Sequence, residues 1–203
     1  LPGAILTRVA KSHIRVGTFQ YAVITKNKKN LKNLFDYTIE RHYPHIKKSK
    51  TPAIDLLKIV MEKQAKLVVN WMRVGFIHGV MNTDNMAISG ETIDYGPCAF
   101  MDTYNPETVF SSIDHHGRYA YSNQPVIAHW NLSRFAEALL PLIHEKKDKA
   151  INIAEETINN FSNIYKTHWL DMMCKKLGLF STKNEDEALI TTLLSWMQQN
   201  KAD

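Results

Sequence analysis

Apolar residues recur at helical intervals along most of this 203-residue chain. In residues 31–43 and 124–143 they stand three and four positions apart, which places their side chains on one face of an α-helix. A longer helix is predicted for residues 52–73, because its first residue is a proline, which is favoured in the first helical turn. Residues 148–201 continue the same spacing and are long enough for two or three amphipathic helices, separated near residues 177–186.

Residues 75–96 break the helical pattern with glycines, asparagines and aspartates, which predicts loops and short strands. Within them, Ser89 and Gly90 separate two short, partly alternating runs and are expected to form the loop of a β-hairpin. That register places Asn85 directly opposite Asp94, with Cα atoms about 4.5–5.5 Å apart and both side chains on one face. The hairpin would therefore bring an amide oxygen and a carboxylate together.

These elements predict a mainly α fold of the α+β class, a helical lobe with one small β-hairpin. A further short helix is expected at Asn105, a good N-cap residue, followed by Pro106. Hydrophobic residues make up 44% of the chain, enough for the core of one domain or one large lobe. No run approaches the roughly 18 apolar residues of a membrane span, and the first residues lack the features of a signal peptide. We expect a fragment of a longer protein with no membrane partner.

The formal charge of +5 comes largely from lysines concentrated in residues 26–32 and 45–50. No aromatic residues alternate with these lysines, so a solvated surface is favoured over a nucleic-acid site. The two cysteines, Cys98 and Cys174, have neither metal-binding nor redox spacing and are expected to be reduced thiols of a cytosolic protein.

The segment "HGVMNTDNMAISGETIDYG" has the spacing of a phosphotransferase site. In kinase-like enzymes an aspartate follows His-Gly as the catalytic base, an asparagine comes five residues later, and an aspartate before Gly closes the motif. Here Asn85 and Asp94 occupy the positions that hold magnesium, an ion that prefers hard oxygen ligands and keeps several waters. Val80 stands at the base position and cannot accept a proton. Asp84 is a substitute base, although an Asx turn capped by its side chain is an equal alternative.

The same segment, extended to "HGVMNTDNMAISGETIDYGPCAFMD" and taken together with "DHHGRYAYSNQPVIAHWNL" and "LTRVAKSHIRVGTFQY", closely resembles the selenoprotein O family. The resemblance covers residues 1–145, a motif-bearing core, and leaves 146–203 as a helical C-terminal extension of one lobe. It implies a protein-kinase-like fold, of which this chain would be the C-terminal lobe. It also implies a protein adenylyltransferase that moves AMP from ATP to Ser, Thr or Tyr hydroxyls of proteins, with ATP flipped relative to kinases.

The resemblance also implies roles for individual residues. Asp84 would be the catalytic base, Asn85 and Asp94 the ligands of Mg²⁺ or Mn²⁺, and Arg8 and Arg15 a pair that grips the ATP phosphates. From spacing alone, two arginines seven residues apart share a face only if their segment is helical, and a surface ion pair is the better explanation for either of them.

The family's ATP-binding lysine and its partner glutamate would lie in an N-terminal lobe that precedes Leu1, so this chain alone is expected to bind ATP weakly. Many members of the family carry a C-terminal selenocysteine or cysteine, which in some pairs with a cysteine after the Asp-Tyr-Gly motif. Redox control by that route is not expected here, because the chain ends in "QQNKAD" and Phe110 stands at the position of the second cysteine. The resemblance further implies a cytoplasmic location for a bacterial-type member, or a mitochondrial one in a eukaryote.

Other polar and aromatic residues are given structural roles. His78 is expected to orient the site loop through hydrogen bonds, and the run Asp114-His115-His116 to form a structural or phosphate-proximal loop rather than a metal site. Three tryptophans are expected in the core or between helices: Trp130, Trp169 and Trp196. Three residues carry no assignable chemistry: Tyr119, Asn123 and Gln124.

Two other functions remain open from the sequence. One is a small-molecule or protein kinase of the same fold, and the other is a non-catalytic pseudokinase lobe that acts as a binding module.

Overall fold

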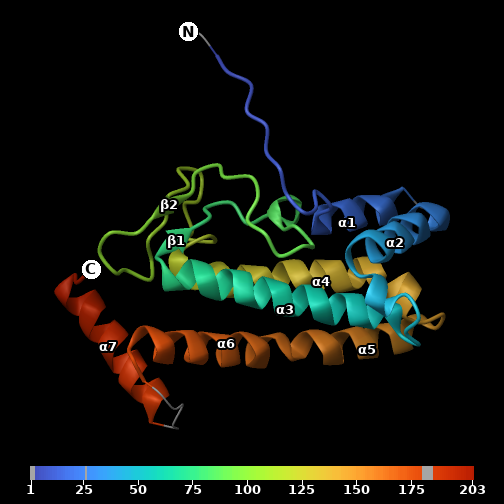
Figure 1. The fold of residues 1–203 in the computed structure, drawn as a ribbon. Helices are drawn as coiled ribbons and strands as arrows, with labels where there is room; N and C mark the ends of the chain where they lie inside the picture. Colours follow the sequence, from blue (N-terminus) through green and yellow to red (C-terminus); the bar gives the residue numbers. More distant parts are fainter. Residues whose placement is uncertain (1–2, 26, 180–184) are drawn as a thin grey trace.

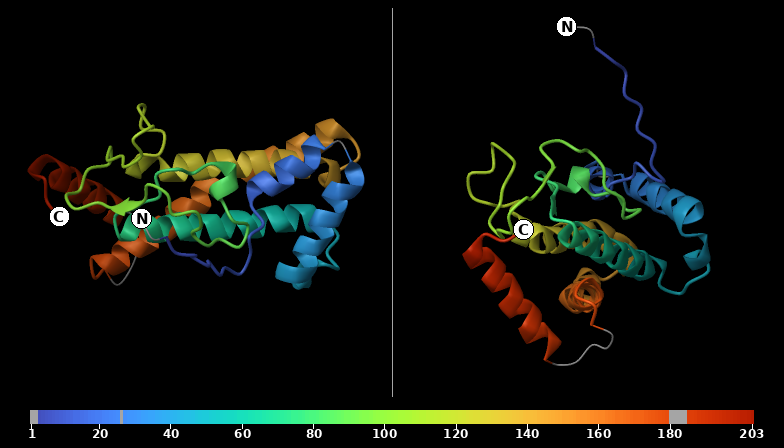
Figure 2. Two further views of the ribbon diagram at one scale, coloured as in Figure 1. Left: turned by 90° about the horizontal axis from the view of Figure 1, so that it is seen from above. Right: turned by 60° about the vertical axis from the view of Figure 1, so that its left-hand side comes forward.

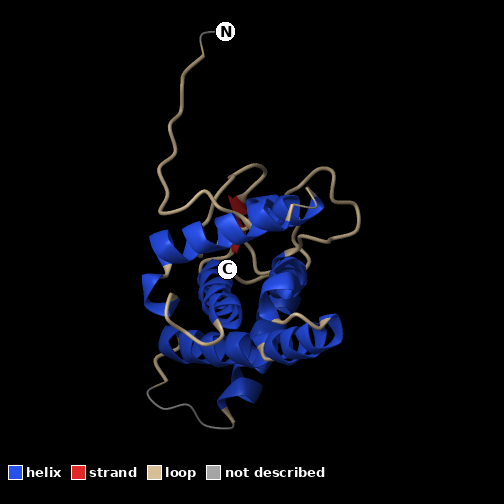
Figure 3. Ribbon diagram, turned by 90° about the vertical axis from the view of Figure 1, so that its right-hand side faces the viewer, coloured by secondary structure: helices blue, strands red, loops and turns tan. Residues whose placement is uncertain are grey.

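The computed structural model describes residues 3–25, 27–179 and 185–203. Helices dominate this part of the chain, and strand is confined to one small sheet (Figures 1 and 3). The helices are α1 (Val16–Ile24), α2 (Lys28–His42), α3 (Pro52–Arg73), α4 (Gln124–Ile143), α5 (Lys147–Asn159), α6 (Phe161–Lys176) and α7 (Asp186–Asn200). The short elements are β1 (Phe76–Ile77), β2 (Ala99–Phe100) and the 3₁₀ turns η1 (Pro44–Ile46), η2 (Thr83–Asn85) and η3 (Tyr121–Asn123).

The mainly helical fold with a small antiparallel sheet is confirmed, whereas the kinase-like architecture stays a prediction. The helices expected over 52–73 and 124–143 have those bounds, and the C-terminal region forms three helices. The break expected near 177–186 falls largely on residues 180–184, which lie outside the described ranges. No helix within the described ranges is long and apolar enough to cross a membrane.

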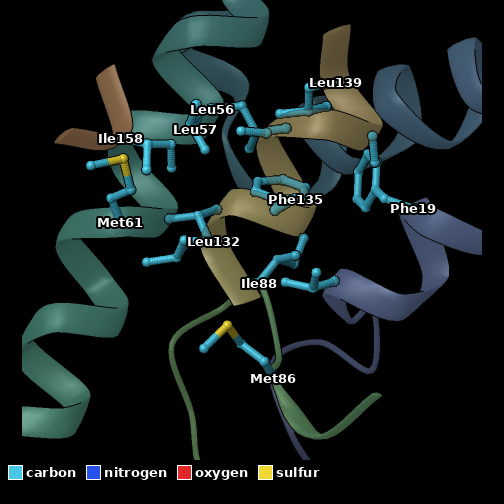
Figure 4. Packing of buried hydrophobic residues seen from close by; sticks show 14 of the residues in the cluster. Phe19, Leu56, Leu57, Met61, Met86, Ile88, Leu132, Phe135, Leu139 and Ile158 are labelled. Carbon is cyan, nitrogen blue, oxygen red and sulfur yellow. The ribbon is translucent and has the colours of Figure 1, made fainter. Parts of the chain in front are cut away.

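Helices α3 and α4 lie side by side at the centre of the molecule. Helices α1 and α2 cover them on one side together with the loops, and α5 and α6 cover them on the other (Figures 1 and 2). Phe19 of α1 meets Phe135 of α4 edge to face, with ring centroids 5.0 Å apart. The loop after β1 adds Met86 and Ile88 to this main core (Figure 4). The central helices contribute Leu56, Leu57, Met61, Leu132 and Leu139. The loop that carries the predicted site is thus anchored in the core.

The predicted hairpin around Ser89 and Gly90 is wrong. The sheet instead pairs Phe76 with Phe100 and Ile77 with Ala99. Residues 86–88 pair with residues 14–16: the Val16 N–H donates to the Met86 carbonyl and the Ile88 N–H to the Ile14 carbonyl, both at 3.0 Å. Ala87 and Ile88 are fully buried, so this strand-like run packs inside the core rather than folding back on its own neighbours.

The short helix expected at Asn105 is also wrong. At Asn105 there is a single turn, whose backbone bonds then go to η3: the Tyr121 N–H donates to the Thr108 carbonyl at 3.1 Å and the Ser122 N–H to the Pro106 carbonyl at 2.9 Å. The condition under which spacing alone would place the two arginines on one face is not met, because residues 8–15 are not helical and α1 begins only at Val16. The arginines therefore share a site for a reason other than helical periodicity.

Two of the three tryptophans are not core residues. Trp130 is 43% exposed and Trp196 is 55% exposed, whereas Trp169 packs against a smaller cluster near the C-terminus. That smaller cluster joins α3, α6 and α7 through Val69, Met172, Met173, Cys174 and Ile190. Cys98 is partly buried against the main core, and both cysteines are free thiols.

Candidate functional site

The predicted site lies in the 78–94 loop, which connects β1 toward β2 and is fastened to the two central helices by buried carboxamides. Gln64 of α3 donates its Nε2–H to the Ala87 carbonyl at 2.6 Å. Asn131 of α4 donates its Nδ2–H to the Met81 carbonyl at 2.8 Å. Both side chains are buried, so each replaces the water that a loop carbonyl would otherwise bind and fixes the path of the loop.

A third carboxamide, Gln124 at the start of α4, fastens the beginning of the loop. Its Oε1 accepts the His78 N–H at 3.0 Å and its Nε2 donates to the Phe76 carbonyl at 2.9 Å. The fully buried His78 ring joins the loop to itself: Nε2 lies 2.8 Å from the Ile93 carbonyl, and Nδ1 accepts the Val80 N–H at 3.4 Å. Burial lowers the pKa of His78, so the ring is neutral. It holds the loop in place through hydrogen bonds, in keeping with its expected orienting role.

Asp84 lies in η2 and is exposed to solvent. Its carboxylate sits over the first turn of α1, so close that a Cβ placed on Gly17 would lie 2.3 Å from its Oδ1. The N-terminus of a helix favours a negative charge. Among the residues that the structure describes, no hydrogen bond or ion pair engages the Asp84 carboxylate, which argues against the Asx-turn alternative and leaves both oxygens available.

Asn85 is held in place by the nitrogen of its side-chain amide. Its Nδ2 donates to the Val80 carbonyl at 2.8 Å, which leaves Oδ1 as the acceptor that can serve a ligand. Val80 therefore contributes a backbone carbonyl that orients the neighbouring amide, although its side chain has no proton chemistry.

Asp94 is the point at which both arginines meet. Arg15 donates to Asp94 Oδ2 from Nε at 3.3 Å and from Nη2 at 2.8 Å, and Arg8 Nη1 lies 3.9 Å from Oδ1. The Arg8 guanidinium also lies 5.6 Å from the centre of the Tyr95 ring. Asp94 has φ 55°, a left-handed conformation that aspartate tolerates better than most residues. Three of the predicted site residues are thus in one cluster.

Backbone pairing explains how Arg15 reaches the loop. The bridge between Arg15 and Ala87 fixes the chain before α1 alongside the 78–94 loop. No local pattern indicates this pairing, because its two segments are more than seventy residues apart. Asn85 and Asp94, by contrast, are not opposed in a ladder, so the geometric argument for their convergence fails even though both remain in the loop.

Known proteins are similar to this chain along its whole length. The family model described as "Protein adenylyltransferase SelO" matches residues 1–203, the whole chain. The chain belongs to the SelO family. It is 63% identical over 203 residues to a protein of Nitrosococcus oceani named "Protein nucleotidyltransferase YdiU", and 62% identical over 201 residues to one of the same name from Pelagibacter ubique. A relative of that name from Bacillus cytotoxicus is 62% identical over 203 residues.

These SelO relatives are longer proteins. The matches cover 99–100% of this chain but only 41% or 42% of the relatives, so the chain spans about two fifths of their length.

The donor chemistry of this SelO chain fits a magnesium ion. The free Oδ1 of Asn85 and the carboxylate of Asp94 are hard oxygens, and an ion that takes few protein ligands completes its shell with water and phosphate. One carboxylate oxygen is held by Arg15, so a cation must share or displace that guanidinium. Within the described ranges, no cluster of three or more His, Cys, Asp or Glu residues could hold a metal by itself.

The Asp114 run has a structural role, as expected. Its carboxylate accepts the backbone N–H groups of Arg118 at 2.9 Å and Tyr119 at 2.7 Å. Slight burial acts to raise the pKa of Asp114, but these bonds and one from the His116 backbone outweigh it and lower the pKa below its ordinary value. The carboxylate is therefore committed to closing its own loop, and the adjacent His115 and His116 remain exposed on the surface.

Proposed function

We propose that this chain supplies the catalytic lobe of a protein adenylyltransferase, which transfers AMP from ATP to the hydroxyl groups of Ser, Thr or Tyr in protein substrates. One observation carries the proposal: a free carboxylate, Asp84, shares a loop with a carboxylate, Asp94, on which two arginines converge. Family membership gives the reaction class, and Val80 removes the base of an ordinary kinase.

Asp84 acts as the general base. It accepts the proton of the acceptor hydroxyl as that oxygen attacks the α-phosphorus of ATP. The new bond joins the hydroxyl oxygen to the α-phosphorus, the bond between the α-phosphorus and its bridging oxygen to the β-phosphate breaks, and pyrophosphate leaves with the electron pair. This step needs the α-phosphate next to Asp84, which is the flipped orientation of ATP.

Arg8 and Arg15 hold the outer phosphates, since guanidinium groups match phosphate oxygens in geometry and charge. Their contact with Asp94 keeps them beside the loop until nucleotide arrives. Asn85 and Asp94 would hold a Mg²⁺ ion, which when bound neutralises charge on the phosphates. The free thiols Cys98 and Cys174 support a cytoplasmic setting.

The full-length protein distinguishes this reaction from its alternatives. It is incubated with magnesium, a cell extract and ATP labelled at either the α- or the γ-phosphate. Protein labelled from the α position only is the expected result. Labelling from γ only would replace the proposal with a kinase, and binding of ATP without labelling from either position would favour a pseudokinase module.

The base assignment has its own variants. Asp84→Asn keeps the shape of the side chain and removes the proton acceptor, so α-labelling should fall by about 10²–10⁴-fold with ATP binding retained. Asp148→Asn makes the same change at an exposed aspartate in the first turn of α5 and should leave labelling unaltered. Equal labelling by the Asp84→Asn protein and the wild type would rule out Asp84 as the base.

A further inference from the structure

A groove of about 610 Å³ opens beside the site, between the loop of residues 113–119 and the start of α4. The groove mixes cationic, imidazole and apolar side chains. It is lined by Ile113, Asp114, His115, His116, Arg118, Tyr119, Asn123, Val126 and Ile127. Ile113 is 78% exposed and Val126 is 63% exposed, so apolar surface is open to solvent here.

Arg118 gives the groove its charge. Its guanidinium lies 4.8 Å from the centre of the Trp130 ring and 5.7 Å from that of Tyr119. Within the described part of the chain it has no ion-pair partner. Arg134, which also lies over Trp130 at 5.3 Å, is by contrast paired with Glu137 at 2.6 Å. From the sequence, Trp130 is expected in the core or between helices. Its exposure is explained by the cation–π contacts that its ring makes with Arg118 and Arg134.

The one carboxylate in the groove lining makes no ion pair with Arg118 among the described residues. Asp114 is occupied by backbone N–H groups of its own loop. Asn123 adds a bond from Nδ2 to the Gly117 carbonyl at 2.6 Å, so the loop is held at both ends. A loop fixed in this way presents the Arg118 guanidinium without an ordering cost on binding.

The groove is joined directly to the catalytic loop. Tyr119 donates its hydroxyl to Asn82 Oδ1 at 2.5 Å, and Asn82 precedes Asp84 by two residues. A protein whose hydroxyl reaches Asp84 must lay neighbouring residues over the adjacent surface. An extended chain covers about 3.3–3.6 Å per residue, so a few residues on one side of the acceptor reach across the groove.

We propose that this groove docks an acidic segment of the acceptor protein, with an Asp or Glu carboxylate near the modified hydroxyl paired to Arg118. The unpaired guanidinium, the open apolar rim and the connection to Asn82 carry the inference. It rests on the proposed adenylyltransferase function and adds a preference of that site for acidic acceptors. The contribution is to acceptor selection, and ATP binding is independent of it.

The test maps AMP-modified sites. Full-length protein labels a cell extract with α-labelled ATP, and mass spectrometry identifies the modified residues and their flanking sequences. Within about five residues of the acceptor, Asp and Glu should be enriched by about threefold to fivefold over unmodified hydroxyl residues of the same proteins, the factor that one exposed ion pair contributes. Arg118→Gln should abolish that enrichment, and Arg118→Glu should replace it with an enrichment of Lys and Arg.

Arg41→Gln provides the matched control, because Arg41 is an exposed arginine at the far end of α2. It should keep the acidic preference, and all four proteins should share one KM for ATP. Absence of acidic enrichment in the wild type, or its persistence in Arg118→Gln, overturns the docking proposal while adenylyltransfer stands. A raised KM for ATP in Arg118→Gln with unchanged enrichment also overturns it, since Arg118 would then contact nucleotide. Absence of any α-labelling by the wild type would instead remove the proposed function itself.

Discussion

Two carboxylates of one loop have opposite surroundings, and this difference supports the different roles proposed for them. Asp94 faces the guanidinium groups of Arg15 and Arg8, an arrangement suited to holding cations and phosphate-binding side chains. Asp84 has no such partner among the residues that the structure describes, and it lies against Gly17 at the positive end of α1. A group that must gain a proton and then release it works best when no permanent ion pair competes for its oxygens.

Gly17 is expected to matter because of the space that it leaves for Asp84. In Gly17→Ala the added methyl group would lie 2.3 Å from Asp84 Oδ1, so the carboxylate must move away. AMP transfer by the full-length protein should fall by about tenfold to a hundredfold, as small misplacements of reacting groups do. Thermal unfolding should shift little or rise, because alanine is favoured over glycine in a helix by about 1 kcal/mol.

Gly3→Ala is the control for that experiment, since a Cβ at Gly3 meets no atom within 4 Å. Unchanged transfer in Gly17→Ala would show that the position of Asp84 over α1 is not needed for catalysis.

His78 should make stability depend on pH. Burial lowers its pKa from the ordinary value of 6.5. Between the lowered pKa and pH 6.5, the ring is therefore protonated in the unfolded chain and neutral in the folded chain. Its contribution to stability is complete above pH 6.5 and is lost as the pH falls from 6.5 toward the lowered pKa. In His78→Gln the slope of unfolding free energy in this window should decrease by up to about 1.4 kcal/mol per pH unit, the value for one proton.

Urea unfolding between pH 5 and pH 8 measures that slope. His42, whose pKa is also lowered by burial, titrates equally in every protein compared. His45→Gln, at an exposed histidine, should keep the wild-type slope, and an unaltered slope in His78→Gln would mean that the ring is not kept neutral by the fold.

The sequence singles out candidate site residues more readily than the residues that hold their loop in place. Asp84, Asn85 and Asp94 stand in a motif with fixed spacing, whereas the buried carboxamides are polar residues on helices and look like surface positions. Gln64 nevertheless carries a signal: it lies four residues after Val60 and four before Val68, on a buried stripe. A polar residue within such a stripe must have a hydrogen-bond partner, which here is the Ala87 carbonyl of the 78–94 loop.

At the scale of elements, the strong helices were predictable and the pairing of the loop was not. The bounds of α3 and α4 follow from apolar periodicity and from prolines in their first turns. Residues 86–88 do have strand character, but periodicity alone cannot name the partner of a strand. Their partner, residues 14–16, is remote in sequence, and only the folded core brings the two together.

Gln124 connects an element to the loop, and its loss should destabilise both. Gln124→Leu would leave the His78 N–H and the Phe76 carbonyl buried without partners, at about 1–3 kcal/mol for each unpaired group. Urea unfolding should show this loss, and hydrogen exchange should show faster opening at His78. Gln199→Leu, the same change at an exposed glutamine of α7, should alter the unfolding free energy by less than about 0.5 kcal/mol. Equal stability of the two variants would mean that Gln124 is not a support of the loop.

At the scale of the whole molecule, two hydrophobic clusters of the described residues stabilise different parts of the fold. The main core includes Met86 and Ile88 of the 78–94 loop together with Phe135 of α4. The smaller cluster, centred on the fully buried Ile190, joins α7 to α6 and to the far end of α3. Tyr165 packs against both, so the clusters touch without sharing their centres.

This division predicts that damage to the smaller cluster spares the site. Ile190→Ala should cost about 2–5 kcal/mol in the smaller cluster, the range for deleting a buried branched side chain. Hydrogen exchange should accelerate in α6 and α7, while the Kd for ATP and the rate of AMP transfer of the full-length protein stay at wild-type values. Leu189→Ala, whose side chain is 54% exposed, is the neighbouring control and should change little. Leu132→Ala in the main core should lower stability and transfer together, because Leu132 packs beneath the loop (Figure 4). Loss of ATP affinity in Ile190→Ala would show instead that the two clusters open as one cooperative unit.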